Sequence, residues 1–424
     1  MPIVSLPSIA GLAAEVFKRV FSKPQLRHFT RYLTGLISCM NRTVQGINDA
    51  FLGHPDQSAL NHFITDSPWD ESELTRVKYE FLRRELKHRG LEGGILIIDD
   101  TISHHVGKHM EGAGWHYDAS EGKAVWGHQL VTSHYVRQWL SVPLGFRIYL
   151  KQDRSEAGFK SKLDLAKELV QEAADNGAEF SCVACDTWYS SADFLGFVEG
   201  LGKDWVTQFK SNRIVISRDM RSLAEWAREI PARNFERITL KRKDGGRETY
   251  YACVRTIRLK HPWKRVRMVI SYAEEDFAER KNPHFYGSNR LEWNARRILQ
   301  TYDRRHEIDA FYKDAKQNLG LEEYELRKIG GIKRHLQMIL VAHLLLSLGS
   351  RSRGAGRAIV CLETTGAACR RVLGEILQSF IRAVLELAKY VRDASKILRL
   401  LSSSKVQIKR MRGRIKALLG ELEV

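Results

Sequence analysis

Three aspartates that are far apart in the sequence, Asp99, Asp186 and Asp309, lie where metal-dependent chemistry could occur. Asp99 and Asp100 end a short apolar run that opens at Gly93, and Asp186 ends a second run, Phe180–Cys185. Short β-branched runs of this kind are typical of strands buried on both faces. Open α/β sheets bind their ligands at the carboxyl ends of such strands. Taken alone, the Asp99-Asp100 pair is more simply explained as the cap of a turn.

The third aspartate, Asp309, belongs to a segment with helical periodicity that we expect to form one helix from about Glu292 to Asn318. One stripe of that helix, at steps of 3, 4, 4 and 3 residues, would carry Tyr302, Arg305, Asp309, Lys313 and Lys316. A charged helix face is usually only solvated, but here one acid is framed by cations. Three converging carboxylates would hold two divalent cations, and oxygen ligands favour Mg²⁺ or Mn²⁺. The expected chemistry is phosphodiester hydrolysis and transesterification.

Composition favours a polyanionic partner. The chain has 424 residues and a formal net charge of +18, so nucleic acid is the first candidate.

The six cysteines are scattered, which fits a reducing compartment. Cys182-Val-Ala-Cys185 falls inside an apolar run, so we interpret these two cysteines as packing residues. The sequence contains no Gly-rich phosphate loop, so ATP use is not indicated. We expect no signal peptide. We also expect no membrane span, because the apolar run from Met338 to Leu346 is too short to cross a bilayer.

Residues 1–90 are expected to form a helical N-terminal domain that binds DNA. Two short helical segments, Thr43 to Leu52 and Asp56 to Ile64, flank a turn at Gly53-His54-Pro55. This arrangement fits a helix-turn-helix with Asn61 and His62 facing outward, and it fits an ordinary helical bundle equally well.

Residues 91–210 read as three strands, a helix, a strand, a helix and a strand. The second and third strands are expected to form a hairpin across Val136-Arg137-Gln138. The helices are expected at Lys160 to Asp175 and Ala192 to Gly200. This order predicts an α/β fold with an RNase H-like mixed five-stranded sheet flanked by helices. In that sheet the first and fourth strands are parallel neighbours, which would bring Asp99 and Asp186 to the same edge.

The remaining sequence divides into three parts. Residues 211–291 alternate polar and apolar positions and are expected to form a β-rich insertion. A purely structural antiparallel sheet is one interpretation of it, and its many Lys and Arg residues favour contact with DNA. Residues 292–345 would supply the last helices of the catalytic core. Residues 346–424 are expected to be a basic helical C-terminal region, with its Lys and Arg residues in contact with phosphates.

These motifs resemble those of DDE transposases of bacterial insertion sequences, in the group that spans families 4 and 701. The resemblance covers roughly residues 90–330 and is carried by Ile97-Ile-Asp-Asp-Thr101, by Cys185-Asp-Thr-Trp-Tyr189 and by the segment from Tyr302 to Leu321. That group has a Tyr, Arg, Glu, Lys signature with two, three and six residues between. The signature falls on Tyr302, Arg305, Asp309 and Lys316, with Asp309 in place of the usual Glu.

The resemblance implies that Asp99, Asp186 and Asp309 are the catalytic acids and bind two Mg²⁺ or Mn²⁺ ions. Asp99 is preferred to Asp100 because the family's first acid is followed by one intervening residue and then Thr or Ser, and because Asp100 would point to the opposite face of the strand. Glu307 lies about 200° around the helix from Asp309 and is not preferred. Contacts with DNA are expected from Tyr302, Arg305, Lys313, Lys316, Trp188 and Lys108.

The same resemblance implies a cut-and-paste transposase that acts on the terminal inverted repeats of its element and on target DNA. We expect a homodimer on paired ends, in the bacterial cytoplasm and associated with the nucleoid. Two alternatives stay open, namely an RNase H-fold structure-selective nuclease and a domesticated, inactive DNA-binding protein. Trp188 fits a core position as well as base stacking. The loop with His104 and His105 has a zinc site as its rival interpretation, although the spacing suits no standard pattern.

Overall fold

The structure is a computed structural model of the chain. It describes residues 2–53, 56–91, 93–152, 158–241, 246–261, 264–349 and 364–391, together with residues 393, 395 and 397. The chain forms two compact units, each made of several segments. The first unit contains residues 1–85, 102–128 and 311–424, and the second contains residues 86–101 and 129–310.

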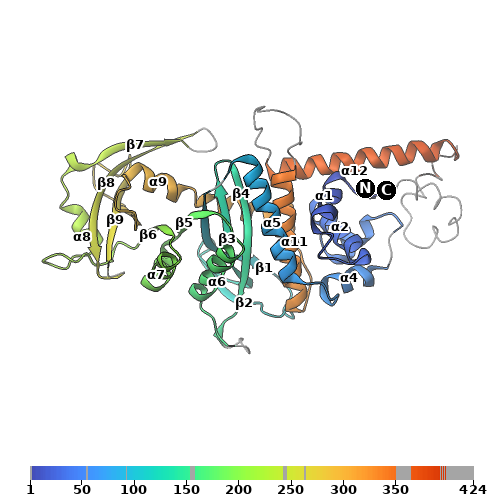
Figure 1. Cartoon of the computed structure of the whole chain (residues 1–424), viewed down its shortest axis with the longest axis horizontal. Coiled ribbons are helices and arrows are strands. Elements are labelled where there is room, and N and C mark those ends of the chain that lie inside the picture. The colour runs from blue at the N-terminus through green and yellow to red at the C-terminus, as the bar shows by residue number, and fades with distance from the viewer. Residues whose placement is uncertain are drawn as a thin grey trace. The chain divides into compact units, whose positions relative to one another are not determined.

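The first unit is mainly helical (Figure 1). Its helices are α1 (Ser8–Phe17), α2 (Lys23–Ser38), α3 (Val44–Ala50), α4 (Gln57–Thr65), most of α5 (Glu71–Arg89), most of α10 (His306–Asn318), α11 (Ile329–Gly349) and α12 (Thr365–Ala388). The strand β2 (Gly114–Asp118) pairs antiparallel with the first residues of β3, Lys123 to Gly127. The N-terminal helices expected from periodicity are therefore present, with ends shifted by a few residues.

The second unit is built on a sheet. Its strands are β1 (Gly94–His104), β3 (Lys123–Arg137), β4 (Leu140–Tyr149), β5 (Phe180–Cys185), β6 (Asp204–Phe209), β7 (Glu236–Lys241), β8 (Arg247–Leu259), β9 (Lys264–Ala273) and β10 (His284–Ser288), the last residues of β1 and the first of β3 belonging to the first unit. Its helices are α6 (Lys162–Asp175), α7 (Ala192–Gly200), α8 (Leu223–Arg228) and α9 (Ala295–Asp303), with short 3₁₀ turns η2 (Thr187–Tyr189) and η3 (Ala232–Asn234).

The strand order confirms the expected core. Strands β4, β3, β1, β5 and β6 follow one another across the sheet, which is the RNase H-like order. The β-rich insertion is also confirmed, but it does not form a separate sheet. Strand β10 pairs antiparallel with β6, and the order continues through β9 and β8 to β7. The insertion therefore extends the core sheet beyond its fifth strand.

The register of β1 and β5 brings two of the predicted acids to neighbouring positions. The two strands are parallel, and Ile98 pairs with Cys185. Asp99 and Asp186 are the next residues of the two chains, so they lie side by side at the same end of the sheet, as expected. The strands lie together because their apolar side chains are buried on both faces; Leu96, Ile97, Val183 and Ala184 are all fully buried.

Helices cover this sheet in two groups (Figure 1). Helices α6 and α7 contact each other, and they pack on β4 and β6 respectively. Helix α9 packs on the strands from β5 and β6 to β8, β9 and β10. Its buried residues, among them Ile298, Leu299 and Tyr302, form one apolar cluster with Cys182 of β5 and Val206 of β6. Helix α9 is thereby fixed against β5 and β6.

The prediction of one continuous helix from Glu292 to Asn318 is wrong. Helix α9 ends at Asp303 and α10 begins at His306. Between them the chain forms a tighter, 3₁₀-like turn. Backbone N–H groups donate to carbonyl groups three residues back instead of four, in the pairs Arg305 to Tyr302, Glu307 to Arg304 and Ile308 to Arg305. Tyr302 and Asp309 therefore lie on different helices, on either side of Arg305, and not on one stripe.

Other boundaries differ in smaller ways. The hairpin between β3 and β4 turns at Gln138 and Trp139, because β3 continues through Arg137 and Gln138 adopts a positive φ of 47°. Helix α6 begins after Ser161, whose side chain accepts a hydrogen bond from the Asp164 amide. Cys182 and Cys185 are free and buried, as the packing interpretation requires.

Some expectations concern residues that the structure leaves undescribed. His54 and Pro55 of the expected turn lie outside the described residues, and so do 350–363 and 398–424, which include most of the basic C-terminal cluster. Helices α3 and α4 pack on each other, with Asn61 half-buried and His62 exposed. DNA binding by this helix pair stays a prediction.

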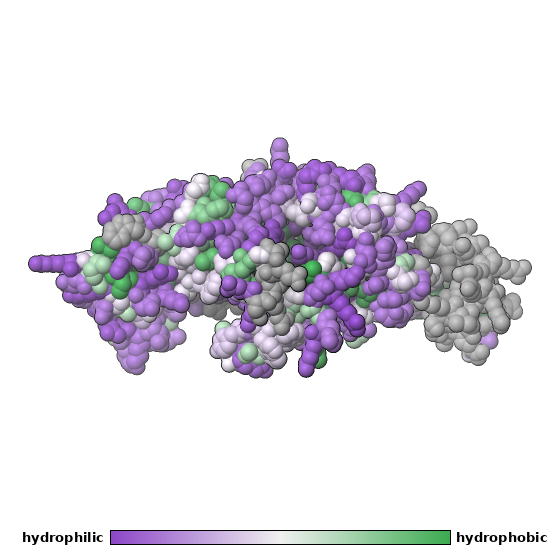
Figure 2. Space-filling model, turned by 90° about the horizontal axis from the view of Figure 1, so that it is seen from below, coloured by the Kyte–Doolittle hydropathy of each residue, from purple (hydrophilic) through white to green (hydrophobic). Residues whose placement is uncertain are grey.

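The surface drawn in Figure 2 is mostly hydrophilic, with hydrophobic residues in scattered small spots. Within the described residues, none of the helices combines the length and apolar character that a bilayer span requires. Helix α11, which contains the apolar run from Met338 to Leu346, is instead buried in the first unit.

Two buried histidines should make the stability of the first unit depend on pH. Burial lowers the pKa of His335 and that of His343, each to about 4. The neutral His335 ring accepts a 2.7 Å hydrogen bond from the Tyr32 hydroxyl at Nδ1, and its Nε2 donates to the Gly320 carbonyl. An unfolded chain, with a histidine pKa near 6.5, takes up protons below that pH that the folded chain does not. Stability therefore falls as the pH falls.

Lowering the pH from about 7 to about 5 is expected to reduce the free energy of unfolding by about 2 kcal/mol for each of these histidines. Urea unfolding at both pH values measures the change, and His343→Leu should remove about 2 kcal/mol of it. His62→Asn, at an exposed position, is the control. An unchanged pH dependence in His343→Leu would contradict the assignment.

Candidate active site

Asp99 is a buried carboxylate at the carboxyl end of β1. Its side chain is 12% exposed, and Oδ2 accepts a hydrogen bond from Arg305 at 2.5 Å. Oδ1 accepts from the backbone N–H of Asp100 at 2.9 Å. Burial raises the pKa of Asp99 to about 7; the Arg305 charge opposes this shift and the Asp186 charge adds to it. A second cation near Asp99 would relieve the cost of keeping this carboxylate charged.

Asp100, the next residue of β1, has a separate set of partners. Its Oδ2 accepts from Lys162 at 2.9 Å and from the Gln129 amide at 2.7 Å. Its Oδ1 accepts from the Tyr189 hydroxyl at 2.9 Å. The Asp100 carboxylate is thus bound by a lysine and two neutral donors on the side where α6 begins.

Asp186 follows β5 and caps the 3₁₀ turn η2. Its Oδ1 accepts from the backbone N–H groups of Trp188 at 2.9 Å and Tyr189 at 3.3 Å. The Thr207 hydroxyl donates to the Asp186 carbonyl, which ties this residue to β6. Burial raises the pKa of Asp186, and the charge of Asp100 adds to the shift, whereas the two backbone N–H groups oppose it. A buried carboxylate, Asp99, and a half-buried one, Asp186, therefore lie side by side, and burial raises the pKa of both.

Arg305 lies between α9 and α10 and connects the predicted acids. Burial would lower its pKa, but the charge of Asp99 raises it well above the ordinary value, with smaller contributions from Tyr302, Asp309 and Asp186. The guanidinium also lies over the Tyr302 ring, 5.8 Å from its centroid. Its Nε is buried and has no hydrogen-bond partner among the described residues. One donor of this arginine is thus left for an acceptor that the protein does not supply.

Asp309 is the most exposed of the three predicted acids, with 51% of its side chain accessible. Its Oδ2 lies 3.3 Å from His306 Nδ1, within the first turn of α10. Its charge acts on Arg305, but among the described residues it does not share a close ligand cluster with Asp99 and Asp186. The structure therefore brings two of the predicted acids together and leaves the third accessible beside the same arginine.

The donor set suits a hard divalent cation. Asp99, Asp186 and Asp309 offer only carboxylate oxygens, which Mg²⁺ and Mn²⁺ prefer. Burial raises the pKa of Asp99 and that of Asp186, and a bound cation would favour the charged form of both carboxyl groups. The residues present therefore fit the metal ions that the sequence predicts.

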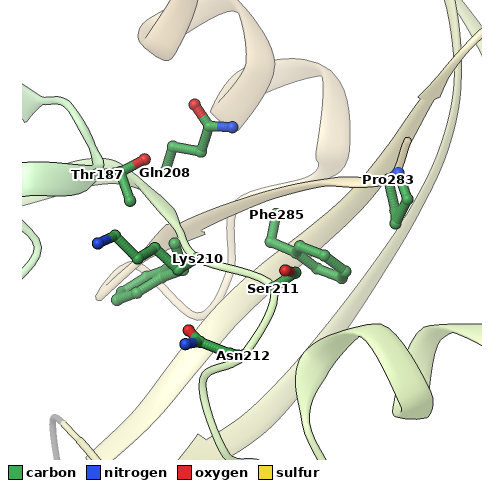
Figure 3. A pocket seen from close by; sticks show the side chains of 8 residues that line it. Thr187, Gln208, Lys210, Ser211, Asn212, Pro283 and Phe285 are labelled. Atoms are coloured by element: carbon green, nitrogen blue, oxygen red, sulfur yellow. The ribbon is translucent and has the colours of Figure 1, made fainter. Parts of the chain in front are cut away.

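Tyr302 is buried in the last turn of α9. Its hydroxyl donates to the Gln208 Oε1 at 3.1 Å, and its ring contacts Tyr286. Gln208 also lines a pocket of about 440 Å³ beside η2 (Figure 3). The pocket is lined by Thr187, Gln208, Phe209, Lys210, Ser211, Asn212, Pro283 and Phe285. Thr187 of its lining directly follows Asp186 in the chain, and the pocket offers one cation, two amides and two hydroxyl groups.

The other residues predicted to contact DNA have mixed environments. Trp188 is 48% exposed, so it is not a core residue, and the Lys162 ammonium lies 5.1 Å from its ring centroid. Lys108 and Lys313 are exposed. Lys316 is half-buried; it donates to the Ile102 carbonyl at 3.0 Å and pairs with Glu322 at 2.8 Å. Lys108, Lys313 and Lys316 belong to the first unit.

A second acidic group lies in the first unit. The ligand atoms of His104, Asp118 and Glu121 lie within 4.8 Å of one another, and no other group this close occurs in the part of the chain that the structure describes. His104 Nε2 lies 3.2 Å from Asp118 Oδ2, and Nδ1 lies 3.6 Å from Glu121 Oε1. An imidazole held between two carboxylates explains this geometry without a metal. His105 is not part of the group.

Sequence reasoning missed several residues that shape the site. Lys162, Gln129 and Gln208 come from segments without a recognisable motif, so only the fold brings them to Asp100 and Tyr302. Tyr189 could have been found, because it ends the Cys185-Asp-Thr-Trp-Tyr189 block. Lys210 follows the last residue of β6, a position where ligands of α/β sheets are common.

Comparison with known proteins agrees with this geometry. A family model described as "DDE superfamily endonuclease" matches residues 15–268. A protein of Microchaete diplosiphon named "Probable transposase for insertion sequence element IS701" is 30% identical over 206 residues, which is 47% of this chain and 53% of that protein. The chain thus spans about half the length of the curated relative that it matches.

Proposed function

Because the chain belongs to the DDE superfamily endonuclease family, we propose that it is a transposase that cuts the ends of an insertion sequence and joins them to target DNA. The observation that carries this proposal is the pair of acids Asp99, which is buried, and Asp186, which is half-buried, side by side at the ends of parallel strands with Arg305 between them and Asp309. The similarity to a probable transposase over half its length supports the same conclusion.

Asp99, Asp186 and Asp309 would hold two Mg²⁺ or Mn²⁺ ions. When bound, the ions supply Lewis acidity and lower the pKa of an attacking hydroxyl or water. The protein's own task is to orient the two carboxyl groups, because Asp99 accepts from the Asp100 backbone N–H and Asp186 accepts from the Trp188 backbone N–H. Asp309, on the exposed side, can adjust to the incoming DNA because its side chain is not fixed by a buried partner.

The DNA backbone would be held by the cations around the acids. Arg305 has a free donor, and its planar guanidinium can grip a phosphate with two hydrogen bonds. Lys210 and the two amides of the neighbouring pocket suit a stretch of backbone that enters beside Asp186. Tyr302 would act by positioning, since its hydroxyl is bound to Gln208. The exposed Trp188 ring is available for an unpaired base. Lys108, Lys313 and Lys316, which belong to the first unit, would make phosphate contacts of their own.

The proposed substrates are the terminal inverted repeats of the element and its target, both double-stranded DNA. Paired ends call for two copies of the protein, so we propose a homodimer on DNA. A DNA substrate also places the protein with the bacterial chromosome, in the cytoplasm and associated with the nucleoid. The net charge of +18 favours such an association.

The test is a cleavage and strand-transfer assay on duplexes that carry the DNA ends flanking the gene. Mg²⁺ or Mn²⁺ should support nicking at the ends and joining of the released 3′-hydroxyl to a plasmid. Removing the metal with a chelator should reduce both products by about a thousandfold, because metal catalysis contributes several kcal/mol. Re-addition of Mg²⁺ is the control.

Two other outcomes of this assay would favour the alternative functions. Cleavage without any joined product would favour the structure-selective nuclease. Salt-sensitive DNA binding without metal-dependent cleavage would favour an inactive DNA-binding protein.

A further inference from the structure

Arg305 and a metal ion need the same atoms of Asp99. The Asp99 Oδ1 accepts the Asp100 N–H at 2.9 Å, and Oδ2 accepts Arg305 at 2.5 Å. With the Asp99 side chain 12% exposed, little of the carboxylate is left open to a further ligand. A cation that binds Asp99 through Oδ2 must displace the guanidinium or share a carboxylate oxygen with it at a cost in charge repulsion.

Arg305 is also incompletely satisfied where it stands. Its side chain is 17% exposed, yet Nε is buried without an acceptor. A buried donor without a partner costs free energy, so an acceptor that reaches it is bound favourably. Phosphate oxygens match the edge of a guanidinium as well as carboxylate oxygens do, so a phosphate would compete with Asp99 for this side chain.

The backbone at Arg305 allows such a movement. The residue lies in the short turn between α9 and α10 and not within either helix. Its N–H bonds the Tyr302 carbonyl, while the side chain rests over the Tyr302 ring. Turning the guanidinium away from Asp99 therefore requires no unwinding of a helix.

We infer that Arg305 holds Asp99 in a state that binds metal weakly, and that a DNA phosphate takes the guanidinium and opens Asp99 to the metal. Metal binding and DNA binding are then coupled through one side chain. This inference rests on the proposed function, because it takes Asp99 and Asp186 as metal ligands. Its consequence is that the DNA-free protein loads the site poorly and the DNA-bound protein loads it well.

The experiment measures Mn²⁺ binding to the DNA-free full-length protein by electron paramagnetic resonance, with no activity readout. Arg305→Gln is expected to tighten Mn²⁺ binding by about tenfold or more, because it removes a unit charge next to the ion. Arg304→Gln makes the same change in net charge one residue away. Its side chain donates instead to the Gln138 carbonyl and pairs with Glu307, so binding should stay at the wild-type level.

Two further variants keep the result interpretable. Arg305→Met retains the apolar stem over Tyr302 and should tighten binding like Arg305→Gln, so either variant carries the comparison if the other fails to fold. Asp118→Asn removes a ligand of the His104, Asp118 and Glu121 group, and Mn²⁺ binding that survives this change is assigned elsewhere.

Equal Mn²⁺ affinity in the wild type, Arg305→Gln and Arg305→Met would overturn the inference. Asp186→Asn in the same assay tests the underlying site and is expected to weaken binding by at least about tenfold. If Asp186→Asn weakens binding while the Arg305 variants do not tighten it, the inference alone fails. If Asp186→Asn leaves the affinity unchanged, the proposed metal site fails as well.

Discussion

Replacing Asp186 with asparagine is expected to reduce cleavage of the DNA ends by about a thousandfold or more while leaving the fold intact. The loss follows because the amide cannot supply the negative charge that holds a divalent cation, and metal catalysis contributes several kcal/mol. The fold should survive because an asparagine side-chain oxygen can still accept from the Trp188 and Tyr189 N–H groups. Single-turnover cleavage in Mg²⁺, with circular dichroism as a check of folding, measures both.

Asp193→Asn is the matched control. It removes the same charge from an exposed residue in the first turn of α7 that pairs with Lys167, and cleavage should change by no more than about twofold. Near wild-type cleavage by Asp186→Asn would remove this residue from the site.

The adjacent pair Asp99 and Asp100 allows a further comparison. Asp99→Asn should lose cleavage like Asp186→Asn. Asp100→Asn should instead lower stability by about 1 to 2 kcal/mol, since it removes the charge that pairs with the half-buried Lys162. If cleavage is lost in Asp100→Asn and retained in Asp99→Asn, the first acid is Asp100.

The sequence predicted the parts of this site that depend on local patterns. Two apolar runs that end in aspartate are strands, and parallel pairing of Ile98 with Cys185 brings their ends together. Ser191 caps α7 and Gly177, with a φ of 70°, follows α6, because caps are decided by residues close in sequence. These features could be derived from residue types and spacing alone.

Features that depend on distant partners could not be derived in this way. The periodicity from Glu292 to Asn318 is continuous and contains no proline or glycine, yet the chain turns at Arg304 and Arg305. Both arginines bond partners far away in the sequence, the Gln138 carbonyl and Asp99. A helix pattern records which face is apolar, and it carries no information about such contacts.

The extension of the sheet by the insertion is a second example. Alternation within residues 211–291 shows that strands form, but it does not show which edge they join. The pairing of Phe285 with Phe209 and of Ser288 with Val206 decides this. The paired residues are too far apart in the sequence to form a β-hairpin, so only the folded structure shows that β10 continues the core sheet. That pairing also forms the pocket beside Asp186, since Phe209 and Phe285 both line it.

Asp309 gives the last prediction, because it is the one acid that differs from the family pattern and the one that the fold leaves accessible. Asp309→Ala is expected to reduce Mg²⁺-dependent cleavage by about a hundredfold or more, through loss of a metal ligand. Asp309→Glu should retain or raise activity. The side chain is 51% exposed and contacts the exposed His306, so an added methylene extends the reach of the carboxylate into solvent.

The rescue by glutamate separates a ligand role from a merely structural one. Asp314→Ala, one turn further along α10, is the matched control, since it removes an acid whose contact is with Asn318. Cleavage rates at several Mn²⁺ concentrations should show that Asp309→Ala needs more metal to reach its maximal rate, and that Asp309→Glu needs no more than wild type. If Asp309→Ala cleaves like the wild type at every metal concentration, the third ligand must be sought elsewhere. Glu307, which is buried and pairs with Arg304, is then the next residue to replace.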